Sequence, residues 1–231
     1  MPIARPMARR AAKAIFDTPM KRLIAELEKR DVRMSQTRAL EVFGATGDGH
    51  LVDYAPLVKS LEIWEIDLTL ECTLKRRFPR AEVKITDAFA EAKQTDSVYD
   101  LIVIDNPLST YGSYCEHFEL FPSVFRIAAD GCVIVVDVIP EASEVARKVY
   151  PYLFNDEQVR RRREFYRTRN PEKISIPEML DTYRSLAIDC GFTLEWHIAV
   201  KRDPLAAKAV KAFLPHRQGL MWYLAFKVRR V

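Results

Sequence analysis

Seven glycines occur in the whole chain, and three of them fall within six residues, at Gly44, Gly47 and Gly49. They directly follow a strand-like apolar run at residues 39–43. Because glycine has no Cβ and tolerates positive φ, this placement predicts a turn that a ligand can approach closely. Twenty residues beyond Gly47, Asp67 closes a second apolar run. Open α/β sheets hold a ribonucleoside with this arrangement, in which a strand, a glycine turn and a helix are followed by a strand that ends in an acid.

Two more acids end predicted strands. Asp87 closes an alternating pattern, and Asp105, followed by Asn106 and Pro107, closes a continuous apolar one. A carboxylate offers two acceptors, so Asp67 suits the two adjacent hydroxyls of a ribose. Two alternatives stay open: Asp67 and Asp87 could cap the helices that follow them, and the Asn-Pro step could merely end its strand.

The segment after Pro107 would overhang the same edge of the sheet. It carries Tyr111 and His117, either of which could orient or deprotonate an acceptor. The unperturbed pKa of histidine makes His117 the natural general base. The alternative is a histidine on a helix surface that has no chemical role.

Hydrophobic periodicity predicts the elements that position these residues. The run at 101–104 is continuous rather than alternating, which is typical of a parallel strand covered on both faces. Ser175 and Glu178 form a capping box before a helix that stops at Gly191. The expected helices lie at about 19–30, 48–58, 70–78, 114–129, 141–152 and 176–190, and the expected strands at 39–43, 61–67, 81–85, 101–104, 132–138, 192–200 and 220–228.

This pattern predicts an α/β fold, a three-layer sandwich with a seven-stranded, mostly parallel, Rossmann-like sheet. Residues 1–37 are expected to form an N-terminal arm and a helix packed on the core. Residues 38–231 would form the main domain, with a basic helical insertion at about 152–175.

Composition sets limits on function. The 231 residues are 48% hydrophobic, enough for one sizeable core, and the formal charge of +4 is compatible with an anionic partner without requiring one. Four widely spaced cysteines, without a C-x-x-C pair, indicate reduced thiols in a cytoplasmic protein and no zinc site. The longest apolar stretch is too short to span a bilayer, so no membrane association is expected.

The order of these motifs resembles the class I S-adenosylmethionine-dependent methyltransferase family. The stretch from Leu40 to Gly47 looks like the family's first motif, an acid followed by a glycine-rich turn. Phe43 and Ala45 stand where the family usually has glycine. The sequence Asp-Asn-Pro-Leu at 105–108 lacks the second proline and the aromatic residue of the amino-methylating signature.

The resemblance implies S-adenosyl-L-methionine as cofactor and transfer of its methyl group to an oxygen or nitrogen acceptor, either a nucleic acid or a small molecule. The methionine part would lie against the first motif, the ribose against Asp67 and the adenine against Asp87. The implied cofactor-binding residues are Glu41, Phe43, Gly44, Ala45, Gly47, Asp67, Leu68, Asp87, Ala88 and Asp105. The implied catalytic residues are Asp105, Asn106, Pro107, Tyr111 and His117.

Three other interpretations stay open. The glycine turn also resembles short-chain NAD(P)-dependent reductases, although that pattern expects a glycine where His50 stands. A catalytically silent nucleic-acid-binding module would use the basic residues Arg160, Arg161, Arg162, Arg163 and Arg167. Asp105 and Asp137 could hold Mg²⁺, but the Asp-Asn pair of metal-dependent methyltransferases reads Asp137-Val138, so no metal is predicted. The oligomeric state is left open.

Overall fold

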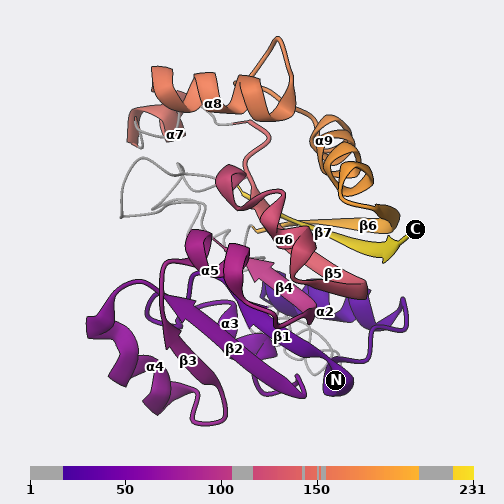
Figure 1. Ribbon diagram of the computed structural model, residues 1–231. Coiled ribbons are helices and arrows are strands. Elements are labelled where there is room, and N and C mark those ends of the chain that lie inside the picture. Colours follow the sequence, from indigo (N-terminus) through magenta and orange to yellow (C-terminus); the bar gives the residue numbers. More distant parts are fainter. Residues whose placement is uncertain (1–17, 106–116, 142–143, 150, 152–154, 203–220) are drawn as a thin grey trace, which may run out of the picture.

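The computed structural model describes residues 18–105, 117–141, 144–149, 151, 155–202 and 221–231, in which helices and strands alternate up to residue 138 (Figure 1). The strands are β1 (Arg38–Glu41), β2 (Ser60–Glu65), β3 (Glu82–Ile85), β4 (Tyr99–Ile104), β5 (Ala128–Val138), β6 (Phe192–Lys201) and β7 (Trp222–Arg230). The α-helices are α2 (Pro19–Glu28), α3 (Leu51–Tyr54), α4 (Glu71–Arg77), α5 (Ala88–Gln94), α6 (Ser123–Arg126), α7 (Glu144–Val149), α8 (Asp156–Tyr166) and α9 (Ile176–Asp189). Short 3₁₀ turns are η1 (Met34–Gln36), η2 (Leu68–Leu70) and η3 (Phe118–Leu120).

The described strands form one seven-stranded sheet in the order β3-β2-β1-β4-β5-β7-β6. Strands β1 to β5 are parallel, and β7 runs antiparallel between β5 and β6. The direction of the connections reverses between β1 and β4, and open α/β sheets bind ligands beside such a reversal, at the carboxyl ends of the strands. The predicted α/β class and the mostly parallel seven-stranded sheet are therefore confirmed.

The apolar residues divide into two clusters, one for each face of the sheet. In β4, Ile102 and Ile104 belong to one cluster, and Leu101 and Val103 to the other. The first cluster also contains residues of α5, α6 and α9, and the second contains residues of α2, α3 and α4. Burial on both faces explains why β4 is apolar at successive positions.

Two helices begin where the sequence predicts. Thr18 caps α2 by accepting a hydrogen bond from the amide of Lys21. At α9, Ser175 and Glu178 make the reciprocal bonds of the predicted capping box. Within the described ranges, no helix combines the length and the apolar character that crossing a membrane requires.

The prediction of a helix at 114–129 is wrong for residues 117–129, the part of this segment that the structure describes. Residues 117–129 instead contain η3, then α6, and then the beginning of β5 at Ala128. Pro122 has no amide N–H to donate, so a helix cannot continue through this segment undisturbed. Gly131, expected to precede the strand, lies inside β5 with φ of 78°. The helix expected at 48–58 is also shorter than predicted, because α3 covers only Leu51–Tyr54.

Candidate functional site

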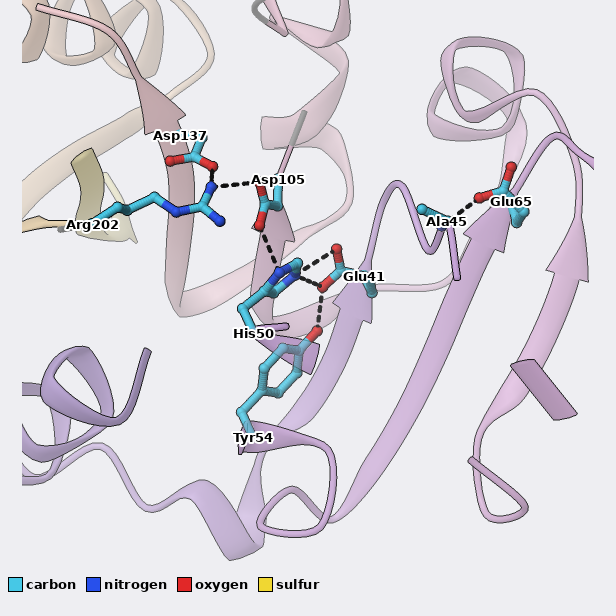
Figure 2. A network of polar contacts seen from close by, with 8 residues as sticks. All are labelled: Glu41, Ala45, His50, Tyr54, Glu65, Asp105, Asp137 and Arg202. Atoms are coloured by element: carbon cyan, nitrogen blue, oxygen red, sulfur yellow. Dashed lines mark hydrogen bonds and ion pairs between the residues drawn. The ribbon is translucent and has the colours of Figure 1, made fainter. Parts of the chain in front are cut away.

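Polar side chains gather at the carboxyl ends of β1 and β4, the two strands that flank the reversal (Figure 2). Glu41 is the last residue of β1 and Asp105 directly follows β4. Both carboxylates are buried, since the exposed fractions of their side chains are 1% and 7%. Buried carboxylates need partners, and the neighbouring elements supply them.

The turn after β1 is closely packed against β2 and α4. A Cβ at Gly44 would collide with the side chain of Ile63, and one at Gly47 with the ring of Phe78. Gly47 has φ of 69°, and Ala45 has φ of 44°, in the left-handed region that favours glycine. Ala45 therefore adopts a glycine-like backbone at the place where the resemblance expects glycine.

Glu65, the last residue of β2, ties this turn to the second strand. Its Oε2 accepts a hydrogen bond from the amide of Ala45 at 2.5 Å, and its Oε1 accepts one from the amide of Asp67 at 2.8 Å. Both carboxylate oxygens thus hold backbone donors of two loops that border the same edge. Sequence reasoning missed Glu65, although an acid ending a buried strand was the signal it used for Asp67.

His50 joins the ends of β1 and β4. Its Nε2 lies 3.1 Å from both carboxylate oxygens of Glu41, and its Nδ1 lies 2.6 Å from Oδ2 of Asp105. Because a carboxylate only accepts, both ring nitrogens must donate, which requires the doubly protonated imidazolium. Burial lowers the pKa of His50, but the charges of Glu41 and Asp105 outweigh it and raise the pKa to about 10.

The two carboxyl groups respond differently to this environment. Burial raises the pKa of Glu41 above its ordinary value, although His50 and the Tyr54 hydroxyl, which donates to Glu41 at 2.6 Å, act against it. Burial also acts to raise the pKa of Asp105, but the positive charges of His50 and Arg202 win and lower it. Asp105 is therefore held as a carboxylate.

Arg202 supplies the second cation, from the chain just after β6. Its Nη1 donates to Asp105 Oδ1 at 2.8 Å and also contacts Oδ2 of Asp137 in β5, and its guanidinium lies 4.6 Å from the ring centre of Tyr223. The other carboxylate oxygen of Asp137, Oδ1, is buried and has no hydrogen-bond partner among the described residues. A guanidinium thus bridges the two carboxylates considered for Mg²⁺, and among the described residues no group of three or more His, Cys, Asp or Glu side chains is arranged to hold a metal ion.

Asp67 and Asp87 lie at the same edge, at the starts of the elements that follow β2 and β3. Asp67 Oδ1 accepts from the amide and the hydroxyl of Thr69, at 2.9 and 2.6 Å. Asp87 Oδ1 accepts from the amides of Phe89 and Ala90, at 2.8 and 3.4 Å. Both acids therefore cap helices, which is the alternative that the sequence left open.

The apolar residues assigned to the cofactor border this edge. Leu68 is 67% exposed, while Ala88 is buried in the first hydrophobic cluster. Phe43 is half-buried, with its ring centre 6.1 Å from that of Phe89. Together with the exposed Ile66, Leu68 places apolar surface on both sides of Asp67.

His117 lies in an aromatic cluster beneath α9, and the contacts of its ring are to Tyr183, Phe118 and Phe121. Its Nε2 is 2.6 Å from the hydroxyl of Tyr183, and its Nδ1 is buried without a hydrogen-bond partner in the part of the chain that the structure describes. Burial lowers the pKa of His117 to about 3, so the ring is neutral. The structure does not bring His117 into the network of Glu41, His50 and Asp105. The other expected catalytic residues, Asn106, Pro107 and Tyr111, lie outside the described residues.

The arginine cluster divides between the two faces of α8. Arg162 is buried and donates to the backbone carbonyls of Pro171 and Ile139, and the nearly buried Arg161 pairs with Glu119. On the outer face, Arg160 pairs with Glu157 and Glu164 of the same helix. Arg163 and Arg167 are exposed. Arg161 and Arg162 therefore hold α8 in place, and a basic surface would depend on the outer residues.

Comparisons with known proteins find the fold but no close relative. No protein-family model matches the sequence, and no curated protein matches it. Among solved structures, N-methyltransferase NodS from Bradyrhizobium japonicum is 13% identical with a TM-score of 0.53, covering 93% of this chain and 99% of that one. TYW2 from M. jannaschii in complex with AdoMet is 12% identical with a TM-score of 0.52, over 96% and 80% of the two chains. PH1948 from Pyrococcus horikoshii, described as a possible RNA methyltransferase, is 13% identical with a TM-score of 0.52, over 94% and 89%.

At these identities the likeness concerns the fold alone. The chain has the Rossmann-like fold of class I S-adenosylmethionine-dependent methyltransferases. S-adenosylmethionine is a cofactor of this fold, as the TYW2 complex illustrates.

Proposed function

We propose that the protein is an S-adenosylmethionine-dependent methyltransferase. The observation that carries this proposal is the convergence of Glu41, Asp67, Asp87 and Asp105 at one edge, beside a turn in which Gly44 and Gly47 leave no room for a Cβ. Acidic acceptors suit the ammonium group, the ribose hydroxyls and the adenine amino group of this cofactor. The expected three-layer arrangement fits the two hydrophobic clusters on opposite faces of the sheet.

Each residue then has a role. Asp67 would accept the ribose hydroxyls through carboxylate oxygens that also cap η2, with Leu68 beside it. Asp87 and Ala88 would border the adenine. The turn from Phe43 to Gly47 and Glu41 would border the methionine end, with Asp105 near the reacting centre.

The cofactor supplies an electrophilic methyl group, which an acceptor oxygen or nitrogen attacks in line. The chain's own contribution is positioning and electrostatics. Asp105 is well suited because His50 and Arg202 keep it ionised, so it accepts hydrogen bonds from the acceptor and stabilises positive charge that develops on it. Asn106, Pro107 and Tyr111 stay predictions for the same region.

The two alternatives have less support. A reductase of the short-chain type expects glycine where His50 makes its two ion pairs. A silent nucleic-acid-binding module would rely on arginines of which Arg161 and Arg162 are engaged inside the fold. The acceptor is left open between nucleic acid and small molecule, and contact with nucleic acid through Arg160, Arg163 and Arg167 stays a proposal. So does a cytoplasmic location, which the free cysteines Cys72, Cys132 and Cys190 favour.

Ligand binding tests the proposal directly. S-adenosylmethionine and S-adenosylhomocysteine are expected to raise the melting temperature, and NADH and NADPH to leave it unchanged, because only a ligand of the folded state stabilises it. In calorimetry, Asp67→Ala should weaken S-adenosylmethionine binding about 10-fold or more, as for a lost charge-assisted hydrogen bond.

The matched control is Asp96→Ala, which removes an exposed carboxylate from the loop before β4. It should bind like the wild type. Stabilisation by a nicotinamide cofactor alone, or equal affinity in Asp67→Ala and the wild type, would count against the assignment.

A further inference from the structure

The charges at the edge of the sheet come close to balance only with a proton on His50. Three buried carboxylates, of Glu41, Asp105 and Asp137, face two cations, His50 and Arg202. Within the described ranges, the other polar groups close to His50 are the hydroxyl of Tyr54, which donates to Glu41, and the ring of Tyr223, whose centre lies 6.4 Å from that of His50. One net negative charge remains in this group.

A cationic ligand at this edge competes with the imidazolium. S-adenosylmethionine carries a positive sulfonium and a positive ammonium group, and the acids that would attract them, Glu41 and Asp105, are the two that His50 already pairs with. Positive charge near a protonated histidine disfavours that form. The carboxylate of S-adenosylmethionine offsets one of its two positive charges, so the whole ligand adds one net positive charge. Where its sulfonium and ammonium groups take Glu41 and Asp105 as partners, the imidazolium loses the carboxylates that stabilise it, and its proton is released more readily.

We propose that His50 is a positioning residue of the cofactor site, whose imidazolium holds Glu41 and Asp105 together and releases its proton to solvent when S-adenosylmethionine binds. The proposal rests on the proposed function. In the release step a ring N–H bond breaks, the electron pair stays on nitrogen, and water or buffer takes the proton. The raised pKa of His50 agrees with the protonated starting state.

S-adenosylhomocysteine is the matched ligand for the test, because it lacks the methyl group and the sulfonium charge but keeps the ammonium. Its binding should therefore release fewer protons. Calorimetry of the full chain at pH 8, in two buffers with different ionisation enthalpies, gives the number of protons released by each ligand. We expect the excess for S-adenosylmethionine to be about half a proton, which makes the ratio of its affinity to that of S-adenosylhomocysteine rise about threefold per pH unit.

Two variants separate His50 from the ligand's own titration. In His50→Gln the protons that the wild-type protein releases on binding should be absent. The affinity should then depend on pH only through the titration of the free ligand's amino group. His197→Gln removes an exposed imidazole on β6 and should behave like the wild type. Equal proton release in the wild type and His50→Gln would overturn the proposal.

A direct measurement covers the case in which His50→Gln does not fold. With His197 and His216 replaced by glutamine, the nitrogen NMR spectrum of the remaining histidines reports on His50 and on the neutral His117. The proposal predicts that His50 gives the spectrum of an imidazolium at pH 8 in the free protein and that of a neutral ring after S-adenosylmethionine is added. A neutral His50 in the free protein, or an imidazolium that persists in the complex, refutes it. Absence of binding by either ligand would instead contradict the proposed function.

Discussion

At the scale of single residues, the site consists of carboxylates whose partners come from elsewhere in the chain. Glu41 accepts from His50 and Tyr54, and Asp105 accepts from His50 and Arg202. Glu65 uses both oxygens on backbone amides. Such buried acceptors are costly without donors, so each partner stabilises the fold as well as the site.

The pH dependence of stability follows from His50. Its folded pKa of about 10 lies above the ordinary value of 6.5, so its stabilising effect is complete below about pH 6.5 and is lost as the pH rises towards 10. We expect His50→Gln to lose on the order of 2 kcal/mol of unfolding free energy at pH 6.5, and less at pH 9.5.

Urea unfolding of the wild type and His50→Gln at both pH values measures this difference. His197→Gln is the control, and its difference from the wild type should be small at both pH values. If the difference in unfolding free energy between the wild type and His50→Gln stays constant or increases with pH, the ion pairs of His50 do not explain its effect on stability.

The residues that sequence reasoning found and those it missed differ in a physical way. Asp67, Asp87 and Asp105 are visible because each ends a predicted strand, which is a local signal, and Glu41 is found through the resemblance of its motif. His50 had a weaker signal, since it lies four residues before Tyr54, a spacing that places both side chains on one face of a helix. Arg202 had none, because it meets Asp105 across a sequence separation of 97 residues.

At the scale of elements, the inner face of α8 carries buried polar side chains as well as Tyr166. Arg162 is buried and donates to carbonyls of Ile139, just after β5, and Pro171. The rings of Phe165 and Phe118 stack beside it, with centres 4.4 Å apart. Of the four consecutive arginines, Arg161 and Arg162 therefore stabilise the fold, whereas Arg160 and Arg163 face solvent. The sequence alone does not show which of them are buried.

Replacing Arg162 tests this attachment. Arg162→Met keeps much of the aliphatic length but removes the donors to two buried carbonyls, so we expect a loss of about 2–4 kcal/mol in the free energy of unfolding. Denaturant titration followed by circular dichroism gives the value. Arg160→Met, which removes only exposed ion pairs, should change stability little; equal effects of the two variants would show that the buried bonds are unimportant.

The elements themselves were predicted unevenly. Continuous apolar runs located β4 and most of β5, and the capping box located α9. The helix expected over residues 117–129 failed because Pro122 interrupts it and because Ala128 already belongs to β5 and pairs with Tyr99 of β4, a pairing that helical periodicity does not encode. Long-range strand pairing overrides local preference in such segments.

At the scale of the whole molecule, the fold agrees with the resemblance that the sequence motifs carry, while the acceptor is open. The formal charge of +4 is modest. Arg163 in α8 and Arg167 directly after it are exposed. If these residues contact nucleic acid, the contact is electrostatic and depends on salt.

Charge reversal at these positions tests nucleic-acid binding. The double variant Arg163→Glu and Arg167→Glu should bind RNA or DNA oligonucleotides more weakly and should reduce the slope of log affinity against log salt by about 1.5–2. Fluorescence anisotropy at several salt concentrations measures both. A wild type that does not bind, or a variant with unchanged affinity and slope, removes nucleic acid from the candidate acceptors at this surface.

The position of β7 in the sheet has a consequence for protein synthesis. Trp222–Arg230 lies between β5 and β6 and pairs with both, so on the ribosome β5 and β6 emerge well before the strand that joins them. Until then the nascent chain has an open apolar edge at β5, which is prone to unwanted pairing. Synthesis that stops before residue 222 would leave this edge exposed and β6 unpaired with the sheet, so the sheet is completed only once Trp222–Arg230 has been made.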